Sequence, residues 1–191
     1  DDFTLDASNY ILNDLWSGYY DIVSAANNAI SQMPIFRQAI KNAQTRVEID
    51  RCEGEARAIR AYAYFNLVRA FGRVPIVDEV LTSEQLASLG QSETLEIYDF
   101  ISEDLDYAIS VLPVSYPSGY SGRITSYTAM AIKAKAMMYA GNWDEVASLA
   151  DKIISSGRYG LMADFREVFS IAGENGKESL FEIQSSTLGN V

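Results

Sequence analysis

The 191-residue chain lacks histidine, contains a single cysteine, and has only 15 basic residues against 26 acidic ones. Without histidine there can be no imidazole base, no histidine-containing triad and no imidazole metal ligand. Because Cys52 is alone, no internal disulfide can form, and we expect this thiol to be plainly structural, buried or half-buried. No phosphate-binding glycine loop and no calcium loop is present, so no cofactor and no metal ion are predicted.

The shortage of basic residues leaves a net charge of −11. This charge argues against nucleic acid as a partner, because neutralising phosphates requires a basic face. It also disfavours peripheral binding to anionic lipid. A run of about 18 apolar residues would be needed to span a membrane, and none occurs. Since 48% of the residues are hydrophobic, the chain can bury one substantial core or two small ones.

The best-defined element is a helix of about five turns that begins at Glu53 and stops at Gly72. Alanine recurs at positions 56, 58, 61, 63 and 70, and the larger apolar side chains surround the axis. A helix that is apolar on most sides is enclosed by other helices. Gly72 suits the position just past a helix end, and Pro75 keeps the following 74–77 segment extended.

Three arginines interrupt this apolar helix and require carboxylate partners or access to water. We expect Arg57, Arg60 and Arg69 to pair with Glu53, Glu55 or carboxylates of the third long helix.

The rest of the chain is predicted to be mainly α, with a few short extended segments. Ser8 or Asn9 is expected to cap the first helix and Pro34 to end it, which leaves 35–50 as a loop with a short helical piece. Thr94 is expected to cap the third long helix, and Thr125 or Ser126 the fourth. The expected elements are helices over 8–33, 96–112, 127–140 and 144–155, short helical pieces at 83–88 and 163–169, and a strand at 180–184.

The stretch 127–157 has the pattern of a divergent tetratricopeptide helix pair. Ala134 precedes Gly141 by seven residues, and Trp143 follows that glycine by two. In such a pair the glycine makes the turn and the aromatic ring fills the wedge between the helices. A plain antiparallel helix hairpin is the alternative. Repeats of this kind stack on one another rather than stand alone.

Several segments together resemble the SusD/RagB family of cell-surface nutrient-binding lipoproteins. The strongest is GEARAIRAYAYFNLVRAFGRVPIV (54–77), which is very close to the main family motif. LWSGYYDIVSAANNAI (15–30) is similar to the family's first-helix motif, with Tyr20, Val23, Ala26 and Asn27 at its core positions and valine in place of isoleucine. EIYDFISEDLDYAISVLP (96–113), the Gly-Arg-initiated stretch 122–161 and ESLFEIQ (178–184) resemble later family segments in the expected order.

The resemblance implies a mostly helical fold of tetratricopeptide-like pairs and a non-catalytic function. Family members are lipid-anchored at the outer face of the outer membrane. They form a lid over a SusC-like TonB-dependent transporter, where they hold a glycan or oligosaccharide, or another nutrient such as a peptide. The anchoring cysteine is missing here, because Cys52 lies inside the fold. We therefore expect residues 1–191 to be one SusD-like helical domain that is a piece of a longer chain.

Sugars bind to flat aromatic faces and to planar hydrogen-bonding side chains, which directs attention to the tyrosines and tryptophans. Tyr116 and Tyr120 lie in the irregular loop 113–123, where loop packing and ligand contact are equally good interpretations. Tyr10, Asn13 and Trp16 lie where the first helix begins, near a glycan-contacting region in some relatives, although Trp16 suits a structural role better. Core packing is expected for the aromatic residues at helical spacing, namely Tyr62, Tyr64, Tyr139 and Trp143.

Two other functions remain open from the residues alone. One is a helical-repeat scaffold that binds a protein and no small molecule. The other is a glycan-acting enzyme, which would need only two carboxylates at a set separation. Glu103, Asp104 and Asp106 are the candidates for that pair, but we expect them on the exposed side of the third long helix.

Overall fold

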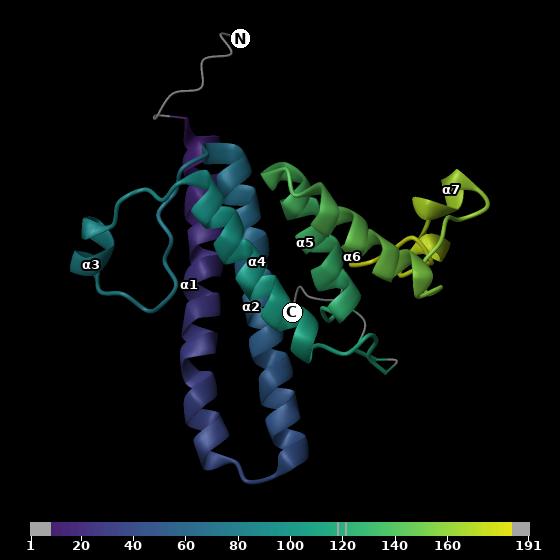
Figure 1. Ribbon diagram of the computed structural model, residues 1–191, viewed down its shortest axis with the longest axis horizontal. Coiled ribbons are helices and arrows are strands. Elements are labelled where there is room, and N and C mark those ends of the chain that lie inside the picture. The colour runs from purple at the N-terminus through teal and green to yellow at the C-terminus, as the bar shows by residue number, and fades with distance from the viewer. Residues whose placement is uncertain (1–8, 118, 121, 185–191) are drawn as a thin grey trace, which may run out of the picture.

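The computed structural model describes residues 9–117, 119–120 and 122–184, and this part of the chain is helical without any strand (Figure 1). Each long helix packs against the next long one: α1 on α2, α2 on α4, α4 on α5 and α5 on α6. The mainly α prediction, with antiparallel pairs, is confirmed. The elements are α1 (Tyr10–Ala39), α2 (Ala43–Phe71), α3 (Ser83–Ser88), α4 (Thr94–Val111), α5 (Ser126–Ala140), α6 (Trp143–Ser155), α7 (Phe165–Val168) and the 3-10 turn η1 (Ile171–Gly173).

α1 and α2 form a long antiparallel hairpin whose tip projects past the other helices (Figure 1). The prediction that Pro34 ends the first helix is wrong, because α1 continues through Pro34 to Ala39. The proposed loop at 35–50 is also wrong, since α2 already begins at Ala43 behind the cap Asn42. Proline removes one backbone hydrogen bond from a helix interior. Beyond Pro34, the extension brings Arg37 into ion pairs with Asp50 and Glu53 of α2, and the earlier start of α2 buries Ile49.

α2 is the buried centre of the molecule, and it ends at Gly72 with a positive φ of 72° as predicted. Tyr64 of α2 is fully buried, and its hydroxyl accepts the backbone N–H of Val77 at 2.7 Å. This bond holds the extended segment 74–77 against the helix, where Val74 is also buried. Burial raises the pKa of Tyr64 to about 12, so its hydroxyl stays protonated.

The arginines of α2 are part of a buried polar network that joins α1, α2 and α4. Asp104 accepts two hydrogen bonds from Arg60, each 2.7 Å long, and one from Arg57 at 3.0 Å. Arg60 also donates to Oδ1 of Asn27 on α1 at 2.6 Å. Glu53 accepts from Arg57 at 2.9 Å and from Arg37. Two of the expected arginine pairs are therefore present.

The third expected pair and the predicted position of Asp104 are wrong. Arg69 donates to the amide oxygen of Asn66, and its guanidinium lies 4.4 Å from the centre of the Phe65 ring. Asp104 is 1% exposed because it faces α2, whereas Glu103 and Asp106 are exposed as expected. Periodicity alone assigned all three carboxylates to the solvent side.

α5 and α6 form an antiparallel pair around Gly141, whose φ of 78° makes the turn. Trp143 does not fill a wedge between them: its side chain is 63% exposed, and Tyr139 and Tyr62 are also exposed. The expectation of core packing for these three is wrong for the described residues, and Tyr64 alone of the four is buried. The assignment of 127–157 to a tetratricopeptide repeat stays a prediction.

Several smaller predictions are corrected by the local geometry. Residues 180–184 form no β-ladder with another described segment, so the predicted strand is absent from the described chain. Glu93, not Thr94, caps α4 through a reciprocal pair of bonds with Glu96. The thiol of Cys52 is exposed, since its position on α2 faces away from the core. Asn9 and Thr125 cap α1 and α5 as expected.

No helix within the described ranges has the length and apolar character needed to cross a membrane.

Candidate functional site

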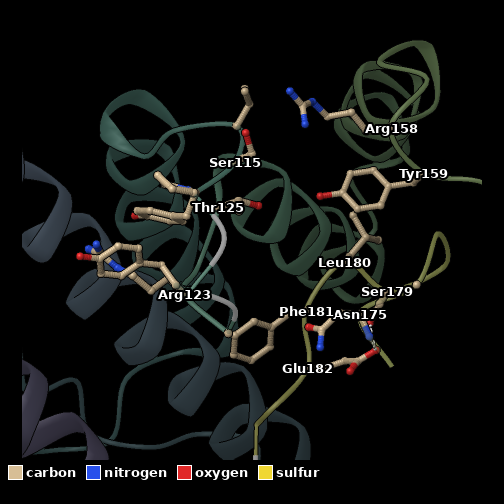
Figure 2. A pocket seen from close by; sticks show the side chains of 16 residues that line it. Ser115, Arg123, Thr125, Arg158, Tyr159, Asn175, Ser179, Leu180, Phe181 and Glu182 are labelled. Carbon is tan, nitrogen blue, oxygen red and sulfur yellow. Dashed lines mark hydrogen bonds between the residues drawn. The ribbon is translucent and has the colours of Figure 1, made fainter. Parts of the chain in front are cut away.

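A hollow of about 340 Å³ lies between the loop that precedes α5 and the segment that follows α6 (Figure 2). Aromatic rings from both sides line it, together with charged and amide groups. The aromatic residues are Tyr116, Tyr120, Tyr159 and Phe181, and the charged and amide residues are Arg123, Arg158, Asn175 and Glu182.

The N-terminus of α5 holds the two walls of the cavity together. Thr125 caps the helix by accepting the backbone N–H of Thr128 at 3.1 Å. The hydroxyl of Thr128 then donates to the backbone carbonyl of Leu180 at 2.7 Å, which ties the C-terminal segment to the helix start. The N–H of Gly160 donates to the carbonyl of Lys177 at 3.1 Å, and this bond holds the Tyr159 region beside that segment.

Tyr116 is fixed by a half-buried ion pair between the loop and α2. Arg123 makes two hydrogen bonds to Glu55 of α2, at 2.9 and 2.8 Å, and its guanidinium lies 4.2 Å from the centre of the Tyr116 ring. The Tyr116 hydroxyl lies 3.4 Å from the same carboxylate. Burial, and then the negative charge of Glu55, raise the pKa of Tyr116 to about 12. Tyr116 is therefore a neutral, positioned donor with one ring face already covered.

The other aromatic residues are freer to meet a ligand. Tyr120 is 57% exposed and Phe181 is 44% exposed. Tyr159 is half-buried, and its ring packs edge-on against Tyr127 with the centroids 5.8 Å apart. Its hydroxyl points into the hollow (Figure 2). These three rings provide apolar surface of the kind that stacks on a sugar ring.

The polar groups of the cavity differ in how far they are already occupied. Oε1 of Glu182 accepts the backbone N–H of Asn175 at 2.9 Å and the hydroxyl of Ser179. The amide of Asn175 exchanges hydrogen bonds of 3.3 Å with the amide of Gln184. Glu182 is the one carboxylate among the described residues that line the cavity, so the cavity walls do not present the carboxylate pair of a glycosidase.

The structure brings together only part of the predicted site. Tyr116 and Tyr120 both line the cavity. Tyr10 and Asn13 are exposed near the start of α1 and do not line it. Trp16 packs against Tyr20 and Phe71, with ring centroids 4.8 and 5.0 Å apart, which is a structural arrangement.

Sequence reasoning missed the opposite wall, which Arg158, Tyr159, Asn175 and Phe181 supply. These residues lie in turn-rich chain between 157 and 182, which has no periodicity that would indicate a shared face. The one sequence feature that could have indicated this wall is the Arg158-Tyr159 pair, which directly follows Gly157 at the end of the helix.

The fold is a series of antiparallel helix pairs with an aromatic-lined cavity beside α5, and the comparisons with known proteins assign its family. Residues 1–138 match the SusD-like family described as "Starch-binding associating with outer membrane". The chain belongs to this SusD-like family.

Individual relatives agree with this assignment. A SusD-like protein of Bacteroides ovatus is 28% identical over 98% of this chain and 35% of its own length. The crystal structure of a SusD-like protein from Bacteroides fragilis is 29% identical, with a TM-score of 0.81, over 92% of this chain and 34% of that one. A laminarin-binding SusD-like protein is 26% identical, with a TM-score of 0.80, over 88% of this chain and 36% of that one. The chain therefore spans about a third of the length of these relatives.

Proposed function

We propose that this chain is part of a non-catalytic protein that binds a glycan at the cell surface. The observation that carries the proposal is the cavity in which the exposed rings of Tyr120 and Phe181 and the half-buried ring of Tyr159 meet amide, hydroxyl and charged groups. Aromatic faces bind the C–H surfaces of a sugar ring, and the polar groups bind its hydroxyls. The family description and the laminarin-binding relative support a carbohydrate as the ligand.

Delivery to a SusC-like TonB-dependent transporter, with a lipid anchor in the outer membrane, is the second part of the proposal. It rests on family membership, whose description includes association with the outer membrane. If it is correct, the full-length protein copurifies from detergent-solubilised outer membranes with such a transporter. Recovery of the protein without a transporter would leave glycan binding as its whole function.

The first experiment is a binding screen against neutral and charged polysaccharides and peptides by affinity electrophoresis and calorimetry. Removing one of the cavity rings by Tyr120→Ala or Tyr159→Ala is expected to weaken glycan binding about tenfold each, which corresponds to roughly 1.4 kcal/mol. Tyr10→Ala tests the alternative location at the start of α1, and Tyr62→Ala is a control for an exposed tyrosine away from both places.

The outcomes separate the two locations and the two classes of function. Loss only in the cavity variants would assign the site to the cavity, and loss only in Tyr10→Ala would move it to the start of α1. Saturable binding accompanied by cleavage of the glycan would overturn the non-catalytic proposal. No binding to any glycan would contradict the proposal as a whole.

A protein-binding scaffold remains the alternative function, and one observation favours it. Large apolar side chains are exposed from the end of α6 to η1, including Ile154, Phe165, Phe169 and Ile171. Phe165 and Phe169 pack against each other with their ring centroids 5.1 Å apart, and an exposed apolar patch is typical of an interaction site. Peptide binding in the screen that is lost in Phe169→Ser, and unchanged in Tyr120→Ala, would support the scaffold.

A further inference from the structure

The proposed glycan cavity carries opposite charges at its two ends. Arg158 lies at one end and Glu182 at the other, with Tyr159 and Leu180 between them in the close-up view (Figure 2). Both charged residues come from the wall that follows α6. A ligand that fills the cavity therefore meets a positive group at one end and a negative group at the other.

The two arginines of the cavity differ in how far they are already paired. Arg123 makes its two hydrogen bonds to Glu55, so its charge is neutralised within the protein. The side chain of Arg158 makes no ion pair and no hydrogen bond among residues 9–117, 119–120 and 122–184; only its backbone N–H is bonded, to the hydroxyl of Ser156 at 3.2 Å. The guanidinium of Arg158 thus keeps its donors available to a ligand.

The carboxylate end has a different role. One oxygen of Glu182 is held by Asn175 and Ser179, which fixes the side chain. A fixed carboxylate accepts hydrogen bonds from sugar hydroxyls and repels an anionic substituent. A sugar with one acidic group would therefore be oriented with that group toward Arg158 and its hydroxyls toward Glu182.

We propose that the cavity selects an acidic glycan, in which a carboxylate or a sulfate ester binds the guanidinium of Arg158. This inference rests on the proposed glycan-binding function. The planar guanidinium matches the geometry of both anions and binds them through two parallel hydrogen bonds. The adjacent ring of Tyr159, which lines the same end of the cavity, offers a surface for the sugar that carries the anion.

The net charge of −11 does not prevent this recognition. At physiological ionic strength the Debye length is about 8 Å, so exposed charges farther away than this are largely screened. Charges within the cavity act at hydrogen-bond distance and decide the preference. The overall charge lowers the rate at which an anionic chain approaches more than it lowers the strength of the final contact.

The test uses oligosaccharides in matched pairs, measured by calorimetry on the 191-residue chain. One pair is an oligogalacturonide and its methyl ester, and the other is a sulfated galactan oligosaccharide and its desulfated form. The anionic member of at least one pair is expected to bind about tenfold more tightly than its neutral counterpart. Preference within the first pair identifies a carboxylate as the anion, and preference within the second pair identifies a sulfate.

Two variants of opposite effect sharpen the test. Arg158→Gln is expected to abolish the preference for the anionic form and to change the affinity for the neutral form less than about twofold. Glu182→Gln keeps an acceptor for the Asn175 N–H and removes a negative charge, so it is expected to strengthen binding of the anionic form. Arg73→Gln is the matched control, because Arg73 is an exposed arginine that does not line the cavity.

Equal or tighter binding of the neutral forms by the wild-type chain would overturn this inference and leave the proposed glycan function intact. An equal loss for both members of a pair in Arg158→Gln would also overturn it, because the arginine would then act through the fold. If no oligosaccharide of either pair binds and the polysaccharide screen is also negative, the proposed function fails together with the inference.

Discussion

Arg60 and Asp104 are the pair of residues on which three helices depend. Both side chains are almost fully buried, at 3% and 1% exposure. Burying two charges costs several kcal/mol each, and the pair offsets this cost only when every donor and acceptor is satisfied. Asn27, Arg57 and the carbonyl of Asp78 complete that set. The arginines of the central motif therefore position α1, α4 and the 77–79 segment around α2 and have no contact with the candidate site.

Arg60→Ala is expected to destabilise the chain by about 3–5 kcal/mol, because the buried Asp104 carboxylate loses the charged partner that gives it two hydrogen bonds. The measurement is the free energy of unfolding in urea. Arg73→Ala is the control: its pair with Glu93 is 2.9 Å long, but both side chains are more than half exposed. That variant is expected to lose no more than about 1 kcal/mol. Similar losses in the two variants would show that the buried network does not hold the helices together.

At the scale of the elements, the close approach of α2 and α4 depends on Gly54. A Cβ atom built on Gly54 would lie 2.6 Å from a methyl group of Val111 and 3.2 Å from Leu112. Gly18 on α1 has no neighbour within 4 Å of the same position. Both glycines lie inside long helices, so each carries the same penalty in conformational entropy. They differ only in how closely neighbouring side chains pack against them. One glycine is needed for helix contact and the other is not.

Gly54→Ala is expected to destabilise the chain by about 1 kcal/mol, because the overpacking cost of about 1–3 kcal/mol exceeds the gain of up to about 1 kcal/mol in helix propensity. Gly18→Ala is expected to stabilise it by about 0.5–1 kcal/mol, since only the propensity changes. Thermal unfolding of the two variants side by side measures the difference. Stabilisation by both substitutions would mean that α4 shifts to accept the added methyl group at no cost.

At the scale of the whole molecule, the buried core is not shared equally along the chain. The fully buried large side chains, such as Tyr64, Leu67, Ile101 and Leu105, lie on α2 and α4 or pack against them. The segment from 158 to 184 buries only Gly173 and exposes Leu161, Phe169 and Ile183. One wall of the candidate cavity therefore belongs to a segment that buries little surface. Among the described residues, the 78–93 segment, which includes α3, is similar and buries no residue.

Hydrogen exchange is expected to follow this distribution. Amides of α2 and α4 should exchange slowest, and those of 78–93 and 158–184 should exchange fastest among the described segments, because local opening is cheapest where little apolar surface is buried. Binding of a glycan should slow amide exchange at 113–117 and 175–182 more than at the start of α1. Mass spectrometry of peptic fragments measures both. Protection confined to the start of α1 would contradict the assignment of the site to the cavity.

Strong local signals were enough to predict most of the helical elements. The alanine-rich run of α2, its end at Gly72, the caps Asn9 and Thr125, and the turn at Gly141 were all predicted correctly. Each depends on the conformational preference of one residue or on a long apolar pattern, which acts before distant parts of the chain meet. The same signals, with the family motif, were sufficient to recognise the family that the comparisons confirm.

Long-range contacts decided the features that local signals did not predict, namely the full length of α1, the burial of Asp104 and the second wall of the cavity. α1 continues through Pro34 and brings Arg37 into ion pairs with Asp50 and Glu53 of α2. Asp104 can be buried because its ion pair with Arg60 of α2 offsets the cost of its desolvation. Of the candidate site, Tyr116 and Tyr120 could be proposed from their loop, while Arg158, Tyr159 and Phe181 could not. These residues meet where the hydroxyl of Thr128, in the first turn of α5, donates to the carbonyl of Leu180, a contact between positions 52 residues apart that no local preference encodes.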